Sequence, residues 1–128
     1  EFNNAPDREL HFLQIWIEPE RRGIAPGYEQ KAFPAEQRQG EWRLVVSQQG
    51  RDGSVSINQD VNLYIGRFAA GERAPIPAVR HAWLQVALGE TEVNGQRLSA
   101  GDAAAFQPGE SIEAVGVKDT EILLFDLA

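Results

Sequence analysis

The stretch "LGETEVNGQRLSAGDAAAFQPGESIEA", residues 88–114, decides the fold. Asn94-Gly95 directly follows Val93, and both residue types accept the positive φ that a two-residue type I′ hairpin turn requires. Gly101 permits a second tight turn because glycine has no Cβ. The segments between these turns are short enough to be barrel strands, so the stretch predicts a hairpin followed by further short strands.

The same alternation of short apolar runs and turn residues extends outward along the chain. No segment combines capping residues with the 3.6-residue period of a helix. Regular short strands with little helix predict an all-β sandwich or barrel. Outside the hairpin, the expected strands are residues 10–17, 42–46, 55–57, 61–68, 82–88, 103–106, 111–115 and 121–127.

The N-terminal third of the chain divides into a strand-like run and a linker. Residues 10–17 alternate with a two-residue period and are apolar on both faces, which predicts a strand buried on two sides. One face carries Leu13, Ile15 and Ile17, and the other carries Phe12, Gln14 and Trp16. Residues 18–40 are polar and interrupted by proline and glycine, which predicts a linker without a core of its own.

Composition narrows the functional classes. The chain has 128 residues, 42% apolar and 24% charged, which fits one globular domain. Its net charge of −7 argues against nucleic-acid binding, and no apolar run is long enough for a membrane helix. Cysteine is absent, which excludes thiolate chemistry and favours a reducing compartment, so we expect a cytoplasmic protein.

Catalytic motifs are not found in this sequence. It has no nucleophile elbow, phosphate-binding loop, dinucleotide fingerprint or H-E-x-x-H motif. The two histidines, His11 and His81, are far apart in the sequence and cannot form a three-histidine site. We therefore expect no catalytic residue in this chain, and we interpret both histidines as structural or partly exposed.

The turns of residues 88–114 resemble those of the cupin superfamily, which implies a jelly-roll, RmlC-like β-barrel. In that superfamily a first motif supplies two histidines and a glutamate to a metal, and a second motif supplies a further histidine. Counting from the turns places the glutamate at Ala82, the first histidines at residues 75–78 and the last histidine at Ile112. None of these positions holds a ligand, and His81 is expected to point out of the barrel because neighbouring strand residues face opposite sides. The resemblance predicts a cupin barrel without its own metal. The matching turns are Leu88-Gly89-Glu90, Val93-Asn94-Gly95, Ala100-Gly101-Asp102 and Pro108-Gly109.

A second resemblance, to the pirin family of two-domain cupins, covers nearly the whole chain. It begins in "EFNNAPDRELHFLQIWIEPERRGIAPGYEQKAF", residues 1–33, where the combination of Q-I-W-I with P-x-Y-x-Q is specific. Later stretches are similar as well. They are "RDGS" at 51–54, "INQD" at 57–60 and "LLFDL" at 123–127.

The pirin resemblance implies a C-terminal half of a longer protein. Residues 1–41 would be the end of a missing N-terminal cupin plus the linker, and residues 42–128 the C-terminal cupin. Bacterial members resemble quercetin 2,3-dioxygenases, which hold one iron-type metal in the N-terminal barrel through three histidines and one glutamate. That glutamate matches Glu1, which would act as a ligand only when the N-terminal domain is present and is otherwise a solvated carboxylate.

The expected function is therefore that of a metal-free structural partner of a dioxygenase barrel. The isolated chain is expected to be inactive and the intact parent to be a metal-dependent dioxygenase. The alternative is a cupin module that binds a small ligand or a protein without catalysis. Exposure of the apolar run 10–17 further predicts a homodimer through these residues, or refolding of the run onto the second barrel.

Four other side chains and one segment are expected to have structural roles. Trp16, Trp42 and Trp83 are expected to be core or interface residues, with Trp83 in the barrel region. Asp126 lies in an apolar strand and is expected to accept hydrogen bonds from the backbone or from an arginine. Proline in residues 74–78 predicts an edge or a loop there.

Overall fold

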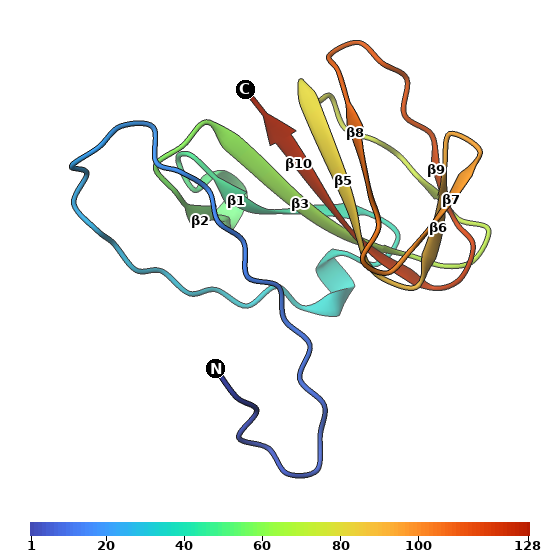
Figure 1. Ribbon diagram of the computed structural model, residues 1–128, viewed down its shortest axis with the longest axis horizontal. Coiled ribbons are helices and arrows are strands. Elements are labelled where there is room, and N and C mark those ends of the chain that lie inside the picture. The colour runs from blue at the N-terminus through green and yellow to red at the C-terminus, as the bar shows by residue number, and fades with distance from the viewer.

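Two β-sheets enclose one apolar core in the computed structural model, which describes residues 1–128 (Figure 1). The six-stranded sheet has the strand order β2-β1-β3-β10-β5-β8, and the four-stranded sheet has the order β4-β9-β6-β7. Every pair of strands is antiparallel except β1 with β2. This architecture confirms the predicted all-β fold. The strands are β1 (Trp42–Ser47), β2 (Val55–Ser56), β3 (Val61–Phe68), β4 (Arg73–Ala74), β5 (His81–Leu88), β6 (Glu90–Val93), β7 (Gln96–Ser99), β8 (Ala103–Phe106), β9 (Ala114–Gly116) and β10 (Thr120–Leu127), with 3-10 turns at Ala35–Gln37 and Arg51–Gly53.

The hairpin predicted at Asn94-Gly95 joins β6 and β7. Asn94 and Gly95 have φ values of 48° and 81°, so both residues adopt the positive φ of the predicted turn. The connection from β5 to β6 depends on Gly89 for a different reason. A Cβ at Gly89 would lie 2.0 Å from the carbonyl oxygen of Asp119, so only glycine fits this close approach.

The predicted strand 111–115 is shifted in the structure, where β9 begins at Ala114. Residues 111–113 bind the hairpin turn instead of a strand partner. The Asn94 side chain donates to the carbonyl of Ser111 at 2.9 Å and accepts from the main-chain N–H of Glu113 at 2.8 Å. The short strand β4 was not predicted, because it contributes only two residues before the proline-containing loop. That loop, residues 75–80, contains no strand, as predicted.

The predicted strand at residues 10–17 is wrong for this chain. The segment is extended but belongs to no strand, and residues 9–17 take part in no backbone–backbone hydrogen bond. A strand requires a neighbouring chain for its N–H and C=O groups, and this domain offers no free edge at that place. The segment crosses the six-stranded sheet as the blue ribbon of Figure 1.

The linker is attached to the barrel at one end. The main-chain N–H of Arg67 donates to the carbonyl of Arg38, and the N–H of Gly40 donates to the carbonyl of Arg67, both at 2.7 Å. Arg38 also forms an ion pair with Glu121 in β10. None of residues 1–41 is buried, which agrees with a linker that has no core of its own. No helix in the structure is long and apolar enough to cross a membrane.

The core lies between the inner faces of the two sheets. Along β10, Ile122 and Leu124 point into it and are fully buried. The intervening residues Leu123 and Phe125 point the other way, into a second apolar cluster on the outer face of the six-stranded sheet. The six-stranded sheet therefore has apolar side chains on both faces. The buried core comprises Phe68, Ala74, Ala82, Leu84, Val86, Val93, Leu98, Ala114, Ile122 and Leu124.

Candidate functional site

The barrel interior is filled by apolar side chains at the positions where cupins hold a metal. Ala82 is 3% exposed and belongs to the core cluster, and Ile76 and Ile112 pack against the same cluster. Alkyl side chains offer no lone pair to a metal ion. No group of three or more His, Cys, Asp or Glu residues is arranged to hold a metal ion anywhere in the structure. The residues present at these positions therefore do not fit the metal that the cupin resemblance implies for a complete site.

The sequence candidates for ligands do not come together. Glu1, His11 and His81 are all exposed, and none belongs to a group of potential ligands. His81 is exposed while its neighbour Ala82 is buried, which confirms that His81 points out of the barrel. These residues form no acid–base or metal site within this chain.

The three tryptophans occupy different environments. Trp42 packs edge-to-face against Phe68 in the core, with ring centroids 5.2 Å apart, and its Nε1 is buried without a hydrogen-bond partner. Trp16 is 87% exposed and Trp83 is 43% exposed. The prediction of a core or interface role is therefore confirmed for Trp42, whereas Trp16 and Trp83 lie outside the core and their interface role stays a prediction. Trp83 lies on the outer face of β5, because its neighbours Ala82 and Leu84 face the core.

The most densely bonded ionisable group is Asp126, at the inner face near the end of β10. Its Oδ1 accepts from the main-chain N–H and the Nε of Arg80 at 2.7 and 3.1 Å. Its Oδ2 accepts from Arg80 Nη2 at 3.2 Å and from Asn62 Nδ2 at 2.8 Å. This confirms the prediction that backbone and arginine donors satisfy the buried carboxylate.

The electrostatics of this cluster favour its ionised form. Burial by itself would raise the pKa of Asp126, but the hydrogen bonds from Arg80 and Asn62 lower that pKa below its ordinary value. The hydrogen bonds that Arg80 donates to Asp60 and Asp126 in turn raise the pKa of Arg80. A carboxylate with four donors has no free position for a substrate proton. The cluster therefore fixes the loop before β5 to the ends of β3 and β10 and has a structural role.

Arg80, Asn62 and Asp60 were not identified from the sequence. Their association depends on the antiparallel register that places Asp126 opposite both Asn62 and Ala82. The signal that could have found them is a carboxylate inside an apolar strand together with an arginine just before another strand.

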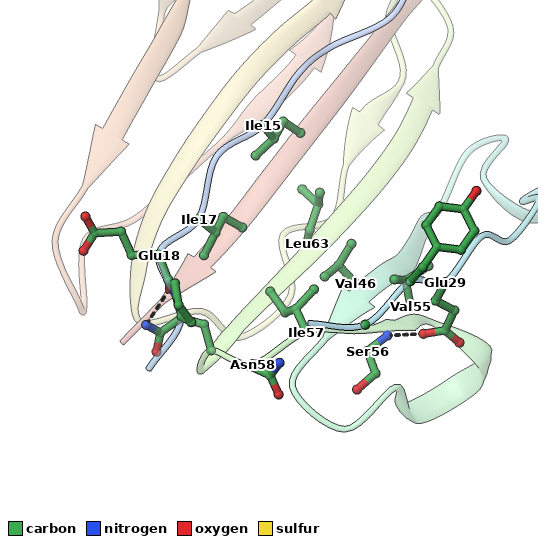
Figure 2. A pocket seen from close by; sticks show the side chains of 14 residues that line it. Ile15, Ile17, Glu18, Glu29, Val46, Val55, Ser56, Ile57, Asn58 and Leu63 are labelled. Atoms are coloured by element: carbon green, nitrogen blue, oxygen red, sulfur yellow. Dashed lines mark hydrogen bonds between the residues drawn. The ribbon is translucent and has the colours of Figure 1, made fainter. Parts of the chain in front are cut away.

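The outer face of the six-stranded sheet carries a large hollow. The hollow has a volume of about 620 Å³ and lies between the N-terminal segment and strands β1 to β3. Figure 2 shows Ile15 and Ile17 of the N-terminal segment next to Val46, Ile57 and Leu63 around the hollow. A second hollow of about 460 Å³ lies beside it, over β5 and β10. The lining of the second hollow is Leu13, Gln14, Ile15, Trp16, Ile17, Trp83, Gln85, Leu123, Phe125 and Leu127.

The rim of the first hollow is polar and carries two carboxylates, Glu18 and Glu29, of which Glu29 is paired. Glu29 accepts from the main-chain N–H of Ser56 at 2.8 Å and lies 2.9 Å from Lys31 Nζ. The hydrogen bond from Ser56 and then that from Lys31 lower the pKa of Glu29. Neither hollow contains a nucleophile with an adjacent base. The outer face is therefore suited to apolar contact and lacks the groups for catalysis.

Comparison with known proteins first gives the class and then the family. A sequence-family model described as "Quercetinase C-terminal cupin domain" matches residues 44–127, so the class is cupin. The crystal structure of YhhW from Escherichia coli superposes with a TM-score of 0.78 and 38% identity over 88% of this chain. A second structure, of the bacterial pirin YhhW in complex with nickel(II), gives a TM-score of 0.74 and 39% identity over 85% of this chain. The chain belongs to the quercetinase C-terminal cupin domain family of pirin-like proteins, and the predicted cupin barrel is confirmed.

Curated relatives are about twice as long as this chain. The quercetin 2,3-dioxygenase of Escherichia coli (strain K12) is 40% identical over 129 residues, which is 99% of this chain and 54% of the relative. YhhW is likewise covered over 48% and 47% of its chain in the two structures. This chain thus spans about half the length of the curated relatives that it matches.

Proposed function

We propose that this chain is the metal-free C-terminal cupin of a two-domain, pirin-like protein and acts as structural partner of a metal-bearing N-terminal barrel. In that protein the N-terminal barrel would bind an iron-type divalent metal and carry activity of the quercetin 2,3-dioxygenase type. The observation that carries the proposal is the apolar filling of the barrel at Ala82, Ile76 and Ile112. The two-domain arrangement and the dioxygenase-type activity are supported by a relative named quercetin 2,3-dioxygenase, which is about twice as long as this chain.

The proposed domain division places the boundary at residues 41 and 42. All strands lie within residues 42–127, and the family match covers 44–127. The absence of buried residues in 1–41 supports their assignment to the end of the preceding domain and the linker. Within this proposal Glu1 is the residue that the chain would contribute to the metal, by resemblance to the pirin pattern. The cytoplasmic location stays a prediction from the absence of cysteine.

The alternative function is a binding module without catalysis, and the outer-face hollow of about 620 Å³ favours it. The barrel interior does not favour a binding module, because it is filled by apolar side chains that are at most 1% exposed. These are Phe68, Leu84, Ile122 and Leu124. A ligand-binding function would therefore be located on the outer face. Trp83 lies beside the second hollow and would report such binding through its fluorescence.

Metal retention tests the leading proposal directly. The purified chain is incubated with Fe(II) or Ni(II), dialysed and analysed for bound metal, with the full-length Escherichia coli relative as the positive control. We expect the chain to retain no metal and to leave a flavonol substrate unchanged under oxygen. Stoichiometric metal retained by the chain, and lost on His81→Ala, would overturn the metal-free assignment. Quenching of Trp83 fluorescence by flavonols, absent in Trp83→Phe, would support the binding module instead.

A further inference from the structure

We propose that Asn94 is a modification site, at which the side-chain amide hydrolyses spontaneously, and that the fold controls this reaction through a latch. The latch is the set of hydrogen bonds that joins Asn94 to residues 111–113. The reaction proceeds when the latch opens locally, and its aspartate or isoaspartate product prevents the latch from closing again. The inference concerns the barrel itself and does not depend on the metal assignment or on a second domain.

The sequence around Asn94 favours the reaction. Asn94 is the one asparagine of this chain that directly precedes a glycine. Because glycine has no Cβ, the main-chain nitrogen of Gly95 can approach the preceding side chain without hindrance. Both residues are exposed, so water reaches the turn. The local chemistry is therefore that of an asparagine prone to deamidation.

The reaction balances with water as its only co-reactant. The main-chain nitrogen of Gly95 attacks Cγ of Asn94, a C–N bond forms, and the bond from Cγ to Nδ2 breaks. Nδ2 leaves as ammonia together with the proton of the Gly95 nitrogen. Water then opens the cyclic imide at one of its two carbonyl carbons. Opening at the side-chain carbonyl gives aspartate, and opening at the main-chain carbonyl gives isoaspartate.

In the folded chain the latch blocks the first step. Nδ2 of Asn94 donates to the carbonyl of Ser111 at 2.9 Å, and Oδ1 accepts from the main-chain N–H of Glu113 at 2.8 Å. The main-chain N–H of Asn94 also donates to the carbonyl of Glu113 at 2.9 Å. Attack requires the side chain to turn toward the Gly95 nitrogen, but both ends of its amide are held by residues 111–113. The amide therefore reacts only after the latch opens.

The latch lies where local opening requires little free energy. The β6–β7 hairpin forms one edge of the four-stranded sheet, and β6 alone joins it to the next strand, β9. Residues 94–97 of the hairpin are exposed. Exposed edges open locally with a smaller free energy than the core of a domain. We therefore expect the reaction to proceed from a native barrel with an open turn and not from the unfolded chain.

The product cannot rebuild the latch. A carboxylate accepts hydrogen bonds but does not donate them, so the oxygen in place of Nδ2 would face the carbonyl oxygen of Ser111. Isoaspartate also lengthens the main chain between Val93 and Gln96, which pair across the hairpin. Ile112 lies between the two latched residues and packs against the core. The modification would thus loosen the barrel at Ile112 irreversibly.

Mass spectrometry of one tryptic peptide measures the reaction. Trypsin cleaves after Arg80 and Arg97, and Asn94 is the only asparagine between them. Deamidation changes the peptide mass by the difference between a hydroxyl and an amino group, and chromatography separates aspartate from isoaspartate. At mildly alkaline pH we expect Asn94 to react at least about 10-fold more slowly in the folded chain than in a synthetic peptide of residues 81–97. Equal rates would overturn the control by the fold.

A core variant distinguishes local opening from global unfolding. Leu124→Ala weakens the closed core and leaves the turn untouched. If the latch opens locally, the reaction in the folded Leu124→Ala chain should stay within about 2-fold of the unsubstituted rate. An acceleration on the order of 100-fold would mean that only the unfolded chain reacts, and it would overturn local opening.

A second pair of variants tests the effect of the product. Asn94→Asp should lower the unfolding temperature by about 5 °C and speed amide exchange of residues 111–113, because the latch is lost. Asn58→Asp makes the same change of charge at another exposed asparagine, in a loop outside the latch. It is the matched control and should shift the unfolding temperature by less than about 1 °C. Equal shifts in the two variants, or unchanged exchange of residues 111–113 in Asn94→Asp, would overturn the irreversible loosening.

Discussion

The inner and outer faces of the six-stranded sheet are built from the same strands but are covered to different extents. On β10, Leu124 faces the core and is fully buried, while its neighbour Phe125 faces outward and is only partly buried. The inner face is covered by a second sheet, and the outer face by an extended segment that makes no backbone hydrogen bonds. The difference shows that a continuous apolar run on a strand predicts two buried faces, but does not predict that one domain covers both of them.

The largest expected effect separates the two faces through adjacent residues of β10. Leu124→Ala should lower the free energy of unfolding by about 3 kcal/mol, because it leaves a cavity in a closed core. Phe125→Ala should cost about 1 kcal/mol, because part of its ring is already in water and the loose cover can relax. Urea unfolding with an unchanged m value measures both. Equal losses would mean that the outer face is covered as completely as the inner one.

A smaller effect is expected at the polar end of the inner face. Asp126→Asn should lower the free energy of unfolding by about 2 kcal/mol, because it removes charged hydrogen bonds to Arg80. This value already includes a reduction for the solvent exposure of Arg80, which weakens the ion pair. Asp60 also binds Arg80, but its side chain is 53% exposed. Asp60→Asn is therefore the matched control, with an expected cost below about 0.5 kcal/mol. Similar costs for the two variants would contradict the assignment of Asp126 as the anchoring partner.

The smallest effect is the pH dependence of the unfolding free energy that each face contributes. The pKa of Asp126 is lowered in the folded state, so its contribution is complete above the unfolded value of about 3.9 and is lost as the pH falls through the folded pKa. The loss of unfolding free energy caused by Asp126→Asn should be constant from neutral pH to about pH 4 and should decrease below pH 4. The cost of Phe125→Ala should not change over that range, because no carboxylate lies in the outer cluster. Unfolding curves of both variants against pH measure the contrast, and a cost of Asp126→Asn that grows in acid would reverse the sign argued here.

Local patterns in the sequence predicted the barrel elements well. The Asn94-Gly95 turn is correct because both residues have positive φ, which is a property of the residues themselves. The strand at 61–68 is also correct to the residue. Asn62 and Arg80, the partners of Asp126, were missed because only the sheet register brings them to its side chain.

The error at residues 10–17 has a different cause. Its pattern indicated correctly that both sides are apolar, yet the segment forms no strand in this chain. A helix satisfies its own main-chain groups, but a strand depends on neighbours that can lie anywhere in the sequence or on another domain. The face of β5 on which Trp83 lies was left open for the related reason that only the register decides which face a residue occupies.

The sequence by itself determined the all-β class, the turns, the cupin and pirin resemblance and the apolar residues at the positions where the cupin resemblance expects ligands. Each of these is encoded in residues close together in the chain, through φ preference, periodicity and side-chain chemistry. Only the tertiary structure decided that Asp126 is held by Arg80, that the barrel interior is filled and that an apolar surface remains on the outer face. These features arise from contacts between distant segments, and their free energy depends on which groups are removed from water when the sheets close.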